Sequence, residues 1–133
     1  MNVDLEKIFC DTFIEKRLRD RIFWELSSPK RRSIAIGRFS DSHMIKASTI
    51  VLYGKNLTKE DLLNEVRKFS NSKTGYMIAL PDELDGKEFP IETAIDKFFY
   101  LGFGAIIIVD SKTAILKCEQ ECGPSRKYVV HAK

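Results

Sequence analysis

The clearest pattern of apolar and polar positions in this chain lies in residues 89–120. After Pro90, apolar residues recur at helical i, i+3, i+4 spacing: Ile91, Ala94, Ile95, Phe98 and Phe99. This spacing predicts an amphipathic helix with one buried stripe. Residues 105–109 follow with no polar alternation, which is typical of a strand that is covered on both faces. The segment therefore predicts a helix that leads into an interior strand.

The N-terminal third predicts two helices. Apolar residues from about residue 4 to residue 26 are three or four positions apart, apart from one five-residue step between Phe13 and Leu18. We interpret this stretch as one helix. Ser27-Ser28-Pro29 then combines a serine N-cap with a proline suited to a first turn, which predicts a second short helix to about Phe39. The two helices should form a packed pair.

Two further strands are expected before the helix described first. Residues 49–53 are apolar and β-branched and end at Gly54, and residues 76–80 form a second run of this kind. Between them, Thr58 and Asp61 have the spacing of a capping box and start a predicted helix over residues 58–69. Residues 114–120 and 127–132 predict two antiparallel strands, with a turn at residues 122–125.

These elements predict an α/β fold, with α+β as the alternative. Two β-helix-β crossovers should place the strands at 49–53, 76–80 and 105–109 parallel to one another. The expected order is two N-terminal helices, then βαβαβ with three parallel strands, then a C-terminal antiparallel ββ pair, giving a mixed five-stranded sheet. We expect a single domain over residues 1–133, with the helical pair of residues 1–40 packed on an α/β sheet unit of residues 48–133.

Composition and charge narrow the functional classes. The chain has 133 residues, 44% of them hydrophobic, and no apolar run long enough to span a bilayer. Its start lacks the basic and apolar segments of an export signal, and an odd count of three cysteines argues against a disulfide framework. We therefore expect a cytoplasmic protein without membrane contact. Residues 13–39 hold eight basic and three acidic residues, a net +5, so the remainder carries −2.

One candidate for catalysis joins Asp82, after the second strand, with Asp110 and Lys112, after the third. A proline-aspartate followed by a carboxylate-x-lysine is how many metal-dependent nucleases hold a cation near the attacked phosphate. In such enzymes the two elements usually lie on neighbouring strands without a complete crossover helix between them. Here a helix intervenes, so turn formation is the favoured interpretation of these residues and no catalytic residue is assigned.

The candidate binding residues fall into a basic and an acidic group. The basic group lies on the N-terminal helices and comprises Arg17, Arg21, Lys30, Arg31 and Arg32. The acidic group lies in the loop after the second strand and comprises Asp82, Glu83 and Asp85. A C-x3-C pair, Cys118 and Cys122, lacks further ligands nearby for zinc, and Cys118 is expected to be a small core residue. No metal and no cofactor is predicted.

These observations lead to three functional hypotheses. The favoured one is a non-enzymatic protein, regulatory or immunity-like, that binds a macromolecular partner, in the first place a protein, through the basic or the acidic group. The second is a metal-dependent nuclease that uses Asp82, Asp110 and Lys112. The third is a nucleic-acid-binding protein that uses the basic helices. The sequence leaves self-association of the chain open.

Overall fold

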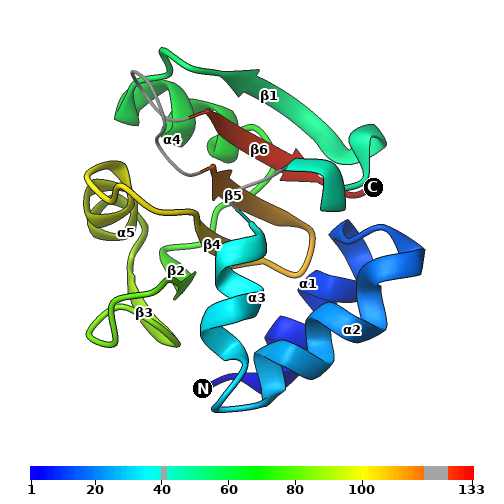
Figure 1. The fold of residues 1–133 in the computed structure, drawn as a ribbon. Helices are drawn as coiled ribbons and strands as arrows, with labels where there is room; N and C mark the ends of the chain where they lie inside the picture. Colours follow the sequence, from blue (N-terminus) through cyan, green and yellow to red (C-terminus); the bar gives the residue numbers. More distant parts are fainter. Residues whose placement is uncertain (40–41, 119–125) are drawn as a thin grey trace.

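The structure is a computed structural model that describes residues 1–39, 42–118 and 126–133 (Figure 1). Within these residues, five α-helices, two 3₁₀ turns and six strands follow one another along the chain. The helices are α1 (Val3–Phe13), α2 (Lys16–Ser27), α3 (Arg32–Arg38), α4 (Lys59–Arg67) and α5 (Ile91–Phe99), and the 3₁₀ turns are Ser42–Met44 and Ala47–Thr49. The strands are β1 (Ile50–Gly54), β2 (Thr74–Ile78), β3 (Lys87–Pro90), β4 (Ala105–Asp110), β5 (Thr113–Lys117) and β6 (Lys127–His131).

The six strands form one sheet in the order β1-β6-β5-β4-β2-β3, and every neighbouring pair is antiparallel. The prediction of a mixed five-stranded sheet with three parallel strands is therefore wrong. The predicted strands correspond to β1, β2 and β4, but β4 runs antiparallel to β2, and β1 lies at the far edge beside β6. The antiparallel pairing of β5 with β6 agrees with the prediction.

The short strand β3 explains the error. It turns back along β2 immediately before α5, with Gly86 at the reversal at φ 72°. A positive φ of this size costs glycine little, so the turn is encoded locally. The crossover through α5 consequently joins β3 to β4, which lie on opposite sides of β2. Because β2 and β4 run in opposite directions, the carboxyl end of β2 lies beside the amino end of β4, and the two carboxyl ends are at opposite ends of this strand pair.

Helices cover both faces of the sheet, which produces two apolar cores (Figure 1). Side chains alternate along each strand, so Ile106 and Ile108 of β4 face α1, α2 and α3, whereas Ile107 faces α4 and α5. Strand β4 lies between β5 and β2 and is buried along its apolar length, as its sequence predicted. The two faces thus have separate cores that share the central strands.

The N-terminal helices differ from the prediction at two places. The helix expected from residue 4 to residue 26 is broken at Ile14, which is extended and forms an isolated antiparallel bridge with Ile45. The break falls in the five-residue step of the apolar pattern. Helix α3 begins at Arg32 and ends at Arg38, because Ser28 and Pro29 form turns instead of a helical start.

The structure also bears on the predicted capping box and on the expectation of no membrane-spanning segment. The capping box is present: the Thr58 hydroxyl accepts from the backbone N–H of Asp61, and the Asp61 carboxylate accepts from the backbone N–H of Thr58. Across residues 1–39, 42–118 and 126–133, every helix is too short or too polar to cross a bilayer.

Candidate binding surface

Four predicted binding residues are exposed along helix α2 and the turn before α3. Arg17 and Arg21 are exposed on α2, and they share a face with Trp24 because the three follow at i, i+4 and i+7. Trp24 is 57% exposed, which is unusual for the largest apolar side chain. Trp24 was not among the predicted binding residues, and its helical spacing from Arg17 and Arg21 is the signal in the sequence that could have identified it.

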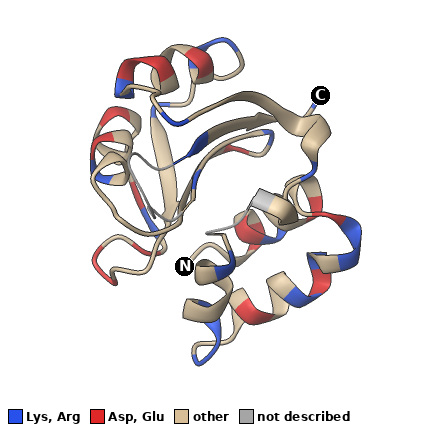
Figure 2. Ribbon diagram, turned by 45° about the horizontal axis from the view of Figure 1, so that its top comes forward, with Lys and Arg blue, Asp and Glu red and all other residues tan. Residues whose placement is uncertain are grey.

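Arg31 completes this surface from the turn before α3. Its guanidinium lies 5.0 Å from the ring centroid of Trp24, a cation–π geometry. Lys30, the candidate directly before Arg31 in the chain, is also exposed. In Figure 2 the ribbon of this region carries basic positions in blue, with acidic positions in red between them. We call Arg17, Arg21, Trp24, Lys30 and Arg31 the α2–α3 surface.

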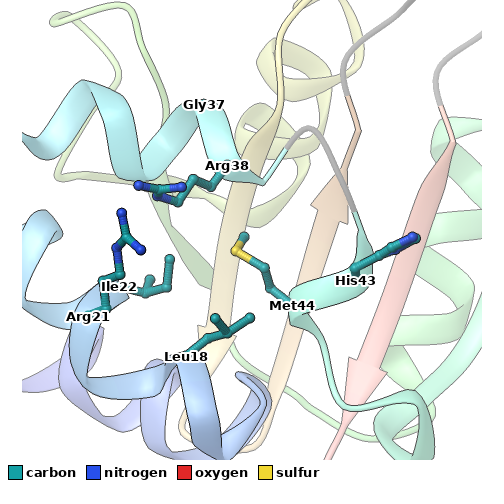
Figure 3. A pocket seen from close by; sticks show the side chains of 7 residues that line it. All are labelled: Leu18, Arg21, Ile22, Gly37, Arg38, His43 and Met44. Atoms are coloured by element: carbon teal, nitrogen blue, oxygen red, sulfur yellow. The ribbon is translucent and has the colours of Figure 1, made fainter.

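A cavity of about 330 Å³ opens beside this surface, between α2, α3 and the 3₁₀ turn Ser42–Met44 (Figure 3). It is lined by Leu18, Arg21, Ile22, Gly37, Arg38, His43 and Met44. The buried Ile22 and Met44 and the half-buried Leu18 form its floor, whereas Arg21, Gly37 and His43 are exposed and form its rim. Arg21 therefore belongs both to the cavity and to the α2–α3 surface.

The two arginines of the cavity share one buried carboxylate. Arg38 donates to Glu25 through Nε at 2.7 Å and Nη2 at 3.0 Å, and Arg21 Nε lies 3.9 Å from the same carboxylate. Glu25 is 2% exposed, and the Arg38 hydrogen bonds hold the pKa of its carboxyl below the ordinary value. One negative charge thus faces two positive charges, leaving a net positive charge at this end of the cavity.

Arg32, the fifth residue of the predicted basic group, does not lie on the surface. It is 7% exposed, and its guanidinium forms a two-point ion pair with Glu6 of α1 at 2.7 Å from each of Nη1 and Nη2. It also pairs with Asp85 and donates to the backbone carbonyl of Leu26. Arg32 therefore joins the N-terminal helices to the sheet and is unavailable to a partner.

The network around Arg32 continues into the sheet. The hydroxyl of Tyr76 on β2 donates to Glu6 and accepts from the backbone N–H of Asn2. Burial, followed by the hydrogen bond to Glu6, raises the pKa of Tyr76 well above its ordinary value. Asp85 in turn accepts from the backbone N–H of Ala79. Each charged group of this network has partners, as a buried ion pair requires.

The predicted acidic group is divided by the structure. Asp82 and Glu83 are exposed in the loop between β2 and β3, where Figure 2 shows acidic residues gathered. Asp85, in the same loop, turns inward to Arg32 and has a side chain that is only 10% exposed. The loop thus offers two carboxylates to solvent instead of three.

The three residues of the nuclease hypothesis are not brought together. The strand register sets Ile78 opposite Ile106, so Asp82 follows β2 at one edge of the sheet. Asp110 ends β4 at the opposite edge, where its carboxylate accepts from the backbone N–H of Lys112 at 2.8 Å, as turn chemistry does. No cluster of three or more potential metal-ligating side chains occurs among residues 1–39, 42–118 and 126–133.

Two buried lysines of the sheet, Lys117 and Lys127, were not among the residues selected from the sequence. Lys117 on β5 is 2% exposed and donates to the carbonyls of Phe98 and Phe99 at the end of α5, at 2.8 and 3.0 Å. Burial and the neighbouring Lys127 lower the pKa of Lys117 to about 8. These contacts satisfy carbonyls at a helix end, where cations are favourable, so we interpret Lys117 as a helix cap.

The cysteines are described in part. Cys118 is buried at 8% exposure, as predicted, and its Sγ lies 3.5 Å from the Tyr128 hydroxyl. Cys122 and the predicted turn at residues 122–125 lie outside the described residues.

The sequence and fold were compared with known proteins in three ways. No protein-family model matches the chain, and no match was found among curated proteins or among solved structures. Any functional conclusion therefore depends on the chemistry of the side chains described above.

Proposed function

We propose that this protein is a non-enzymatic binding protein that recognises an acidic surface of a partner protein through the α2–α3 surface. The observation that carries the proposal is the exposed Trp24 with the Arg31 guanidinium 5.0 Å from its ring, on the helix face that also presents Arg17 and Arg21. Tryptophan and arginine are the residues most enriched among those that dominate protein–protein binding energy.

Charge supports an acidic partner. Of the three acidic residues in residues 13–39, Glu25 is buried beneath Arg38 and does not reach the surface. Asp20 is the exposed acid of α2, whereas Arg17, Arg21, Lys30 and Arg31 are all exposed. Complementary charge increases association rates and excludes partners of the wrong sign. A regulatory or immunity-like role fits a surface of this kind.

A charge-reversal experiment tests the proposal. The double variant Arg17→Glu/Arg31→Glu places acidic side chains on the α2–α3 surface, and Lys73→Glu/Lys112→Glu makes the same charge change at exposed lysines elsewhere. Each variant and the unaltered protein are immobilised and exposed to nuclease-treated extract of the source cell. We expect at least one protein of the extract to bind the unaltered protein and the second variant but not the first. Once purified, this protein should bind the first variant with at least tenfold lower affinity than the unaltered protein.

Two outcomes would contradict this proposal. If every recovered protein is retained equally by both double variants, the α2–α3 surface is not the binding surface. If proteins are retained only from untreated extract, and their retention falls steeply with salt, the same cations bind nucleic acid, which was the third hypothesis.

A further inference from the structure

The cavity beside the α2–α3 surface has one charged end and one apolar floor. Figure 3 shows the guanidinium groups of Arg21 and Arg38 near each other at one end, with His43 on the other side of Met44. The floor between them consists of the apolar side chains of Leu18, Ile22 and Met44. A cavity of about 330 Å³ is at the small end of the range for ligand-binding pockets.

The charged end is suited to a carboxylate. Arginine carries five N–H donors in a planar fork, and the hydrogen bonds of Arg38 to Glu25 through Nε and Nη2 occupy only part of that fork. The side chain of Arg21 is 66% exposed, and its Nε lies 3.9 Å from Oε2 of the same buried carboxylate. Glu25 thereby orients the Arg38 guanidinium, and its single negative charge lies beside two positive ones, so a second carboxylate would restore the charge balance.

The floor limits which anion fits. Leu18, Ile22 and Met44 offer no hydrogen-bond donors, so a strongly hydrated ion such as phosphate would lose water contacts there without replacement. A carboxylate attached to an apolar group would place its charge at the arginines and cover the floor with its hydrocarbon part. Both halves of the cavity would then be matched.

We propose that this cavity binds a carboxylate carried on an apolar group, such as the C-terminal carboxylate of an apolar residue. Such a group can come from the acidic partner protein or from a free carboxylic acid of the cell. For the partner as source, the assignment rests on the proposed function, because Arg21 joins the cavity to the α2–α3 surface.

The direct test uses N-acetylleucine and its amide, which differ only in the charge of the carboxyl group. Binding is followed by the NMR shifts of the methyl groups of Leu18, Ile22 and Met44 in the full chain. We expect saturable shifts with the acid in the millimolar range, and at least tenfold weaker binding of the amide and of inorganic phosphate.

A variant pair locates the binding charge. Arg21→Met removes one guanidinium and leaves the Arg38–Glu25 pair intact, whereas Lys16→Met removes an exposed cation of α2 that lies outside both the cavity and the α2–α3 surface. We expect Arg21→Met to weaken N-acetylleucine binding about tenfold and Lys16→Met to leave it unchanged, with equal melting temperatures as the folding control.

Three results would overturn the assignment: absent shifts, equal binding of acid, amide and phosphate, or equal effects of the two variants. None of them requires the partner, so failure here is separate from failure of the proposed function. Competition identifies the source. If saturating N-acetylleucine displaces the captured partner, the partner supplies the carboxylate, and if the partner stays bound, a free carboxylic acid is the ligand.

Discussion

The guanidinium of Arg32 and the carboxylate of Asp85 form a two-point ion pair, with Nε to Oδ2 at 2.6 Å and Nη2 to Oδ1 at 2.9 Å, although 53 positions separate the residues. The sequence assigned these residues to two different binding surfaces. Because they pair with each other in the interior, both are removed from the set that a partner can reach. The pair ties α3 to the β2–β3 loop, so it contributes to the placement of the N-terminal helices.

Truncation of the neighbours Arg31 and Arg32 should change the free energy of unfolding by very different amounts. Arg32→Ala leaves the carboxylates of Glu6 and Asp85 buried without their cation and should lower the free energy of unfolding by about 3–5 kcal/mol. Arg31→Ala removes an exposed side chain and should change it by less than about 0.5 kcal/mol. Urea unfolding followed by circular dichroism measures both values. Similar losses in the two variants would mean that Arg32 is not a buried ion-pair residue.

Two glycines provide a second pair with opposite expectations. A Cβ on Gly75 of β2 would lie 2.6 Å from Ile107 Cγ2 and 3.2 Å from Ile91 Cδ1, so Gly75→Ala should lower the unfolding free energy by about 1–3 kcal/mol. A Cβ on Gly37 meets nothing within 4 Å, and this glycine lies inside helix α3. Gly37→Ala should therefore raise the unfolding free energy by about 0.5–1 kcal/mol. Thermal melts of both variants test the two signs, and a stabilised Gly75→Ala variant would contradict the packing of β2 against α5.

The buried Lys117 predicts a pH dependence of stability. Its pKa is lowered to about 8 in the folded protein, from the ordinary lysine value of 10.5, so the unfolded chain binds more protons between these values. Stability should consequently rise as the pH rises from 8, by up to about 1 kcal/mol per pH unit. Above pH 9 an opposing contribution begins, because burial raises the pKa of Cys10 from 9.0 to about 12.

The Lys117 contribution is isolated with a matched variant. Lys117→Met should lose most of the increase in unfolding free energy between pH 8 and 9, whereas Lys112→Met, at an exposed turn position, should keep it. Denaturant unfolding at fixed pH steps gives both slopes. An unchanged slope in Lys117→Met would show that another group titrates in this window.

Local signals in the sequence predicted several elements well. The capping box at Thr58 and Asp61 and the continuous apolar run of β4 depend on neighbouring residues, and both are present. The prediction of the topology was wrong because it missed β3. Lys87–Pro90 has two charged residues and a proline, and so shows no apolar alternation. Gly86 before it was the one local sign of a reversal.

The candidate site was predictable only in part, for a physical reason. Exposure of Arg17 and Arg21 follows from the helical pattern, whereas burial of Arg32 is set by Glu6 and Asp85, which are distant in sequence. No local pattern distinguishes Arg31 from Arg32. The cavity likewise depends on the packing of the turn Ser42–Met44 against α2, and no periodicity along the chain predicts that contact.

The most direct test of the proposed function is the affinity of the captured partner for Trp24→Ala and for Phe103→Ala, measured by titration calorimetry. Both variants truncate an exposed aromatic side chain, at 57% and 47% exposure, but only Trp24 lies on the α2–α3 surface. We predict a loss of about 2 kcal/mol or more for Trp24→Ala, and a change below about 0.5 kcal/mol for Phe103→Ala. Equal affinity of the two variants would contradict binding through the α2–α3 surface.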